Sequence, residues 1–236
     1  MKTAPNAGSI IVSNYSLQLL HAADMEGGGG DLLNAPNFVS IVDHLEDQNP
    51  NTLMLSSGDL VLPGPYLTAA GDDDLQPAIQ AAAEAIYDQP AGTLSGIEAA
   101  SGRVETLLAD LMDTAAVTLG NHEFDQGTEL IADMIAPVVG EGGTLADIKW
   151  IGSDFAYLSS NLDFSGDSNL SSLATEDILT SGESNATLEE IAAGDNSSKL
   201  APAMVQEVNG EEIGVIGVTT QILESVSSPG DTEVLT

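Results

Sequence analysis

The sequence predicts an α/β domain built on a parallel sheet, and three observations support this. Short apolar runs that end in polar turns alternate along the chain with segments of helical period. Such an alternation implies parallel strands joined by helical crossovers. Asp24, Asp59 and Asn121 follow three successive predicted strands. Because ligands bind parallel sheets beyond the carboxyl ends of the strands, these residues mark a candidate site.

The predicted elements follow in chain order from the spacing of apolar residues. A strand over residues 16–24 leads into a glycine-rich loop, and a helix over 37–46 has Asn37 as its N-cap. The next predicted elements are strands at 52–59, 115–119 and 157–161 and helices at 76–87, 102–112 and 128–139. Asn209-Gly210, between apolar runs at 203–208 and 213–219, predicts a hairpin. We interpret residues 163–198, rich in Ser, Asn, Gly and acidic residues, as a solvated insertion rather than part of the core.

The charge balance restricts the partners of this chain. Its 236 residues include 37 acidic and only 4 basic ones, a formal charge of −33. Without a basic surface to meet phosphates, duplex nucleic acid and anionic membranes are poor partners. The acidity fits a salt-adapted (halophilic) surface, a set of divalent-cation sites or simple solubility. The near absence of lysine favours the salt-adapted surface.

Cysteine and long apolar segments are both missing from the sequence. The chain has no cysteine, so it can form neither disulfides nor thiolate metal sites. No stretch approaches the ~20 apolar residues of a membrane-spanning helix. Residues 1–15 form an N-terminal extension in which we see no signal peptide. We expect residues 16–236 to belong to one domain.

Residues 118–127 crowd an amide, an imidazole and two carboxylates against an apolar run. Asn121 offers a neutral oxygen to a metal, His122 can exchange a proton, and Asp125 can orient that imidazole. Asp24 and Glu26 lie two positions apart after the first strand, and Asp59 follows a glycine. Hard oxygen ligands with a histidine suit Mn²⁺, Mg²⁺, iron or Zn²⁺. A pair of such ions about 3.5–4 Å apart activates water and clamps a phosphoryl group.

At these residues the chain resembles the calcineurin-like metallophosphoesterases, in the 5′-nucleotidase and 2′,3′-cyclic-nucleotide phosphodiesterase branch. The blocks that carry the resemblance are Leu-His-Ala-Ala-Asp-Met-Glu-Gly at 20–27, Ser-Gly-Asp at 57–59 and Gly-Asn-His-Glu-Phe-Asp at 120–125. The resemblance implies a layered sandwich of mixed sheets flanked by helices. It also implies a metal-dependent hydrolase, a small phosphate ester or nucleotide as substrate, and an extracellular or periplasmic location.

The resemblance also implies a role for each residue. Asp24 would ligate one of two divalent ions, Asp59 would bridge both, and Asn121 would ligate the second. His122 would stabilise the transition state or protonate the leaving oxygen, with Asp125 paired to its other nitrogen. On physical grounds that pairing fixes the tautomer and raises the basicity of the imidazole.

The chain departs from the family pattern in two places. Glu26 stands where the family most often has histidine, which should shift the metal preference from Zn²⁺ toward Mn²⁺, Mg²⁺ or Ca²⁺. The family also has later histidines, in a Gly-His-x-His block, that would lie beyond Thr220. The chain has only His21, His44 and His122. We therefore interpret it as the N-terminal part of a longer enzyme, weak or inactive alone. The metal identity and oligomeric state stay open.

Other readings of the same residues stay open. The chain can instead be a non-catalytic, acidic cation-binding fragment, or an extracellular interaction module that keeps the scaffold. Among the single residues, His21 and Arg103 are interpreted as structural and His44 as solvated. Glu123 is interpreted as a hydrogen-bonding partner rather than an acid catalyst.

Overall fold

A five-stranded parallel sheet lies at the centre of the computed structural model, which describes residues 14–25, 31–184, 186–194 and 198–235. Its strands, in spatial order, are β1 (Gln18–Ala22), β2 (Thr52–Ser56), β3 (Thr114–Thr118), β6 (Ala156–Leu158) and β9 (Leu200–Ala201). Every neighbouring pair in this sheet is parallel. The predicted parallel sheet is therefore confirmed, and its strands all end at one edge.

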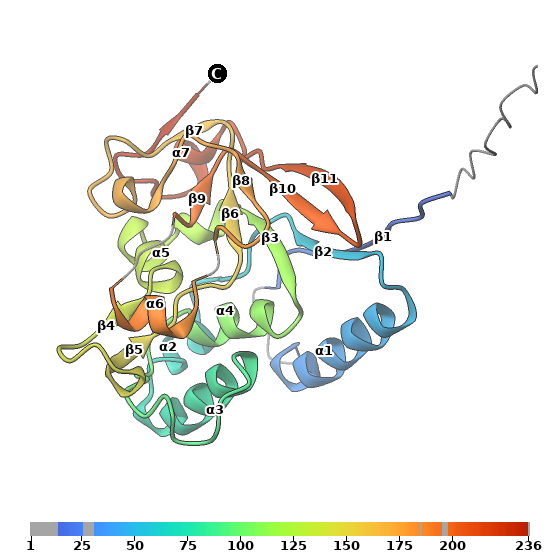
Figure 1. The fold of residues 1–236 in the computed structure, drawn as a ribbon. Helices are drawn as coiled ribbons and strands as arrows, with labels where there is room; N and C mark the ends of the chain where they lie inside the picture. The colour runs from blue at the N-terminus through green and yellow to red at the C-terminus, as the bar shows by residue number, and fades with distance from the viewer. Residues whose placement is uncertain (1–13, 26–30, 185, 195–197, 236) are drawn as a thin grey trace, which may run out of the picture.

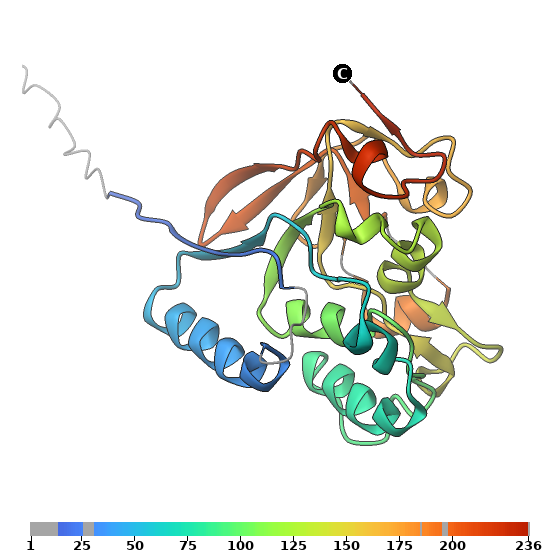
Figure 2. The ribbon, with the colours of Figure 1, turned by 180° about the vertical axis from the view of Figure 1, so that it is seen from behind.

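Helices cover one side of this sheet and a β-hairpin covers the other, as the two opposite views show (Figures 1 and 2). The helices are α1 (Asp31–Gln48), α2 (Pro65–Ala69), α3 (Gln76–Ile86), α4 (Arg103–Asp110), α5 (Thr128–Ile135), α6 (Leu188–Ala192) and α7 (Leu223–Val226). Short 3₁₀ turns lie at Asp73–Leu75, His122–Phe124, Leu145–Asp147 and Ser171–Leu173. Within the described ranges, no helix combines the length and the apolar character needed to cross a membrane.

A second, mixed sheet is formed by β8 (Leu179–Thr180), β10 (Ala203–Val208) and β11 (Glu211–Ile216). β10 pairs antiparallel with β11 and parallel with β8. The hairpin turn has positive φ at Asn209 (49°) and Gly210 (88°), the geometry that the Asn-Gly pair favours. Two-stranded pairs join β4 (Val138–Val139) to β5 (Ile148–Trp150) and β7 (Leu162–Asp163) to β12 (Glu233–Val234).

Buried apolar side chains fill the space on both sides of the central sheet. On one side Val117 and Tyr157 pack with Phe124 and the α5 residues Ile131 and Met134. On the other side the small sheet contributes to a cluster formed by Ala116, Ala156, Leu158, Leu179, Ala201 and Met204. The layered α/β sandwich with mixed sheets that the resemblance implied is confirmed by this arrangement.

Two sequence predictions about the ends of helices are wrong. Helix α1 begins at Asp31, so Asn37 lies inside the helix rather than at its N-cap. The prediction failed because Asn37, directly after Pro36, is a residue typical of a helix start. Helix α5 ends at Ile135 because Ala136, before Pro137, is extended. The expected helix at 128–139 therefore gives its last residues to β4.

Residues 163–198 contribute to the core, which corrects the expectation of a solvated excursion. The buried apolar side chains in this segment are Phe164, Leu170, Leu173, Leu179, Leu188, Ile191 and Ala192. Only Leu188, Ile191 and Ala192 follow a helical period, and the others are spaced irregularly. Short 3₁₀, strand and helical elements separated by polar turns nevertheless place them in three of the buried apolar clusters.

Candidate functional site

Three polar turns meet at the carboxyl edge of the central sheet. Asp24 lies just after β1, Asp59 after β2 and Asn121 after β3, and these strands are neighbours in the sheet. The backbone N–H of Asp24 donates to the carbonyl oxygen of Gly58 at 3.2 Å, which ties the first turn to the second. Glu26, predicted as a further ligand, lies outside the described residues.

Two glycines allow the second and third turns to approach closely. Gly58 has φ of 98°, and a Cβ atom there would lie 2.4 Å from the carbonyl oxygen of Thr118. A Cβ atom on Gly120 would lie 2.2 Å from Oδ1 of Asp59. Larger residues at either position would therefore displace the Asp59 carboxylate or separate β2 from β3. The two glycines place that carboxylate directly over the third turn.

Asp24 and Asp59 both adopt left-handed backbone conformations, with φ of 53° and 55°. Aspartate accepts this region more readily than most residues, at a modest energetic cost. The turn residue Asp88 has the same conformation with φ of 48°. Positive φ is therefore no mark of function by itself, and Asp88 offers a matched reference for substitutions at Asp59.

A buried carboxylate, Glu123, links the second and third turns. Its oxygens accept hydrogen bonds from the backbone N–H groups of Asp59 (3.0 Å), Leu60 (2.7 Å) and Gly120 (2.7 Å). Burial, aided by the nearby Asp59 charge, raises the pKa of Glu123 to about 7, although the three donors act in the opposite direction. The interpretation of Glu123 as a hydrogen-bonding partner is confirmed, since it fixes the spacing of two turns.

The imidazole of His122 is held by a carboxylate, as the sequence predicted. Nδ1 of His122 lies 2.6 Å from Oδ2 of Asp125, and both side chains are half-buried. The backbone N–H of His122 donates to Oδ1 of Asp59 at 2.9 Å. Ser227 donates its hydroxyl to the other Asp125 oxygen at 2.7 Å. Sequence reasoning missed Ser227, which lies 102 positions away in a segment with no recognisable motif.

The end of the fourth strand, β6, supports this edge through a buried polar network. The Asn161 side chain accepts from the N–H of Thr219 and donates to its carbonyl oxygen, at 2.8 and 2.9 Å. The Thr219 hydroxyl lies 2.9 Å from that of Ser159 and donates to the carbonyl oxygen of Leu119 at 2.8 Å. The chain beyond β11 is thereby attached to the residue that precedes Gly120-Asn121.

The described donors at this edge fit a divalent cation in chemistry but do not by themselves form a complete ligand set. Carboxylate and amide oxygens suit hard cations such as Mn²⁺, Mg²⁺ or Ca²⁺. Asp24 is exposed, while Asp59 and Asn121 are half-buried. Within the described part of the chain, no three His, Cys, Asp or Glu residues are grouped closely enough to hold a metal ion. The edge therefore contributes part of a site.

The remaining sequence interpretations concern single residues outside this edge. Arg103 is buried, donates to the carbonyl oxygen of Glu98 at 2.5 Å and lies 4.8 Å from the centre of the Trp150 ring. Its structural role is therefore confirmed. His44 is exposed on α1, as predicted. His21 is also exposed on β1, so it is not part of the core.

The layered α/β core and the polar residues at its edge are similar to those of phosphoesterases. Comparisons with known proteins show which ones. No protein-family model matches the chain. The trifunctional nucleotide phosphoesterase YfkN of Bacillus subtilis is 27% identical to it over 134 residues, which is 55% of this chain and 8% of that protein. The 5′-nucleotidase precursor from Thermus thermophilus superposes on 93% of this chain with a TM-score of 0.54 and 20% identity.

The resemblance to the calcineurin-like phosphoesterases of the nucleotidase branch is thus confirmed. The solved calcineurin-like phosphoesterase YfkN structure is 17% identical over 92% of this chain, with a TM-score of 0.45. The chain spans 32% of the length of the Thermus structure and 53% of that YfkN structure. It therefore corresponds to only part of its relatives.

Proposed function

We propose that this chain forms part of a metal-dependent phosphoester hydrolase that acts on nucleotides or related small phosphate esters. One observation carries the proposal, namely that Asp24, Asp59 and Asn121 meet at one sheet edge beside an imidazole–carboxylate pair. The similarity to a nucleotide phosphoesterase and the fold of a 5′-nucleotidase support it. The hydrolase activity is proposed for the whole protein to which this chain belongs.

The proposed ligand roles follow the order of the turns. Asp24 and Glu26 would hold one divalent cation, Asp59 would bridge two, and Asn121 would hold the second. Bound cations would activate water and stabilise the charge that develops on the phosphoryl group. Because the donors are oxygen-rich, Mn²⁺, Mg²⁺ or Ca²⁺ suits them better than Zn²⁺.

His122 would act on the leaving group. Its Nδ1 is committed to Asp125, so a proton delivered to the leaving oxygen would come from Nε2. Asp125 orients the ring and stabilises its protonated form, and Ser227 fixes the rotation of Asp125 through its second oxygen. Glu123 would keep Asp59 and Gly120-Asn121 at a constant separation.

The charge of the protein imposes a condition on this function. A chain with a formal charge of −33 repels an anionic nucleotide at low salt. Bound cations would reverse the local sign, and salt near 1 M would shorten the screening length to about 3 Å. We therefore propose that the surface of the protein is adapted to high salt, as the sequence predicted. We also propose that the protein acts outside the cytoplasm, and the similarity to the Thermus 5′-nucleotidase precursor supports this.

A metal titration tests the proposal directly. Mn²⁺, Zn²⁺ and Ca²⁺ are titrated into the chain by calorimetry in high salt, with Asp59→Ala and the matched control Asp88→Ala. Both substitutions remove one carboxylate from a left-handed turn residue, so charge and backbone strain change equally. We expect saturable binding of one or two ions that weakens at least tenfold in Asp59→Ala alone. Weak binding at many sites, equal in all three proteins, would contradict the proposal.

A further inference from the structure

Asp24, the first of the proposed metal ligands, is held in place differently from Asp59. The Asp59 carboxylate accepts a hydrogen bond from the backbone N–H of His122 at 2.9 Å, which fixes the position of that carboxylate. Asp24 is exposed, and within the described ranges no such side-chain hydrogen bond reaches its carboxylate. Its backbone has a left-handed φ of 53°, a conformation that persists only where surrounding contacts impose it. The backbone hydrogen bond to Gly58 fixes one point of this turn, and a second contact is needed to fix its orientation.

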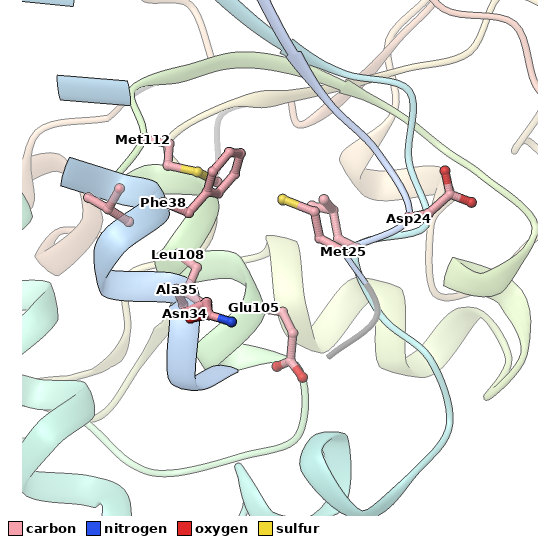
Figure 3. Close-up of a pocket in the computed structure, with 10 residues that line it drawn as sticks. Asp24, Met25, Asn34, Ala35, Phe38, Glu105, Leu108 and Met112 are labelled. Carbon is pink, nitrogen blue, oxygen red and sulfur yellow. The ribbon is translucent and has the colours of Figure 1, made fainter. Parts of the chain in front are cut away.

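Met25, the next residue in the chain, provides this second contact. Figure 3 shows its side chain pointing toward the Phe38 ring, while Asp24 points away from both. Met25 packs against two buried apolar clusters, one that contains Leu60 and one that contains Met112. A flexible thioether side chain fills such an irregular space well. The two adjacent residues therefore face opposite ways, Met25 toward the apolar interior and Asp24 toward the sheet edge.

A largely apolar cavity of about 340 Å³ lies beside Met25, between α1, α4 and the turn after β1. Phe38, Leu60 and Met112 line it, together with Glu105, whose carboxylate is directed away from Met25 and Phe38 (Figure 3). Because neighbouring side chains do not fill this space, they would not replace the contacts of a shortened Met25. The orientation of the turn should therefore depend on this one side chain.

We propose that Met25 is a positioning residue for the metal edge, which fixes the direction of the Asp24 carboxylate by packing into the apolar side of the cavity. The inference rests on the proposed function, because it concerns the cation that Asp24 would hold. Leu60 directly follows Asp59 and lines the same cavity. Packing around this cavity thus supports the first two of the three polar turns.

Calorimetric titration of Mn²⁺ into the chain in high salt tests this role. Met25→Ala removes most of the side chain, and Met25→Leu keeps an apolar side chain of similar volume. Met112→Ala is the matched control, because Met112 lines the same cavity and is only 1% exposed but adjoins no proposed ligand. Urea unfolding of each variant measures the change in stability separately and confirms that the variant is folded.

We expect the Mn²⁺ affinity to fall about fivefold or more in Met25→Ala, and to stay at the parent value in Met25→Leu and Met112→Ala. Met112→Ala should nevertheless unfold at a lower urea concentration than the parent, because it leaves a buried cavity unfilled. In an Asp24→Asn protein, adding Met25→Ala should not weaken the remaining Mn²⁺ binding further, since the effect acts through Asp24.

A second substitution excludes an effect confined to the backbone at position 25. Phe38→Ala removes the ring toward which Met25 points, from a helix that contributes no proposed ligand. We expect its Mn²⁺ affinity to fall about twofold or more. Ile41→Ala, also exposed on α1 but outside the cavity lining, should bind Mn²⁺ as the parent does.

Three results would overturn the inference and leave the proposed hydrolase standing, provided that the parent chain binds Mn²⁺ saturably. They are equal affinities in Met25→Ala and Met112→Ala, equal affinities in Phe38→Ala and Ile41→Ala, and a further loss from Met25→Ala in the Asp24→Asn protein. Absence of saturable binding to the parent chain would overturn the inference and the proposed function together. The two failures are therefore distinguishable.

Discussion

Carboxylates are buried at both ends of the central sheet, and the protein compensates them in two different ways. At the carboxyl edge, Glu123 is held by three backbone N–H groups. At the opposite end, Asp110 at the end of α4 and the half-buried Asp154 lie near the buried ammonium group of Lys199. Lys199 also donates to the carbonyl oxygens of Ser153, at 2.7 Å, and of Ser184.

This difference separates a candidate site from a structural cluster. At the amino end of the sheet, Lys199 supplies the positive charge within the protein, so no external cation is required. At the carboxyl edge only the dipoles of backbone N–H groups compensate the Glu123 carboxylate. The negative charges of Asp24 and Asp59 therefore remain available to a cation. An edge that combines fixed N–H donors with uncompensated carboxylates is suited to bind a cation. Substitutions at each end test this contrast.

The largest effect is expected from Lys199→Met. This change removes the donor of two buried hydrogen bonds, to the carbonyl oxygens of Ser153 and Ser184, and each acceptor left unpaired costs about 1–3 kcal/mol. We expect the free energy of unfolding, measured with urea at pH 7, to fall by about 3 kcal/mol, because two buried acceptors lose their donor. The matched control is Lys149→Met, because Lys149 pairs with Glu98 at the surface, at 2.7 Å. The control should lose less than about 1 kcal/mol. Equal losses would mean that the Lys199 cluster contributes no more than a surface pair.

A smaller loss of stability is expected from Glu123→Gln, together with a loss of metal binding. The amide replaces one acceptor oxygen by a donor, so at least one backbone N–H loses its partner, at about 1–3 kcal/mol. We expect the Mn²⁺ affinity to fall with it, because Asp59 and Gly120 are no longer held together. Glu129→Gln, on the exposed side of α5, is the control for charge. Unchanged Mn²⁺ affinity in a folded Glu123→Gln protein would show that the metal edge does not depend on this carboxylate.

The smallest effect concerns Glu46 at the amino end of the sheet. Burial, together with the charges of Asp113, Asp43 and Asp47, raises its pKa from 4.5 to about 7. The folded protein keeps this proton up to about pH 7, whereas the unfolded chain releases it near pH 4.5. The folded state thus binds more protons in this window, and stability falls as the pH rises through it.

Glu46→Gln removes that dependence. We expect the variant to melt about 1–2 °C above the parent protein at pH 8 and at the same temperature near pH 4. Glu46 is partly solvent-accessible, so 1 M salt should reduce the difference. The Glu129→Gln protein again serves as the charge control. A larger stabilisation at pH 4 than at pH 8 would reverse the sign of the predicted repulsion.

Several features could be read from the sequence because each is encoded by neighbouring residues. Apolar runs identified β1, β2, β3 and the β10–β11 hairpin, and the motif at 120–125 placed His122 beside Asp125. Local patterns failed where a contact joined distant segments. Ser227 supports Asp125 without any motif, and the buried residues between 163 and 179 show no period.

By itself, the sequence determined the order of the elements, the parallel sheet and the polar residues that follow its strands, since these depend on local periodicity and turn chemistry. The tertiary structure alone decided what those residues meet. Segments far apart in the chain form three of these features. They are the close approach of Gly58 to Gly120, the hydrogen bonds of Glu123 to two turns and the cavity beside Glu105. Such contacts depend on packing in three dimensions, which spacing along one segment does not encode.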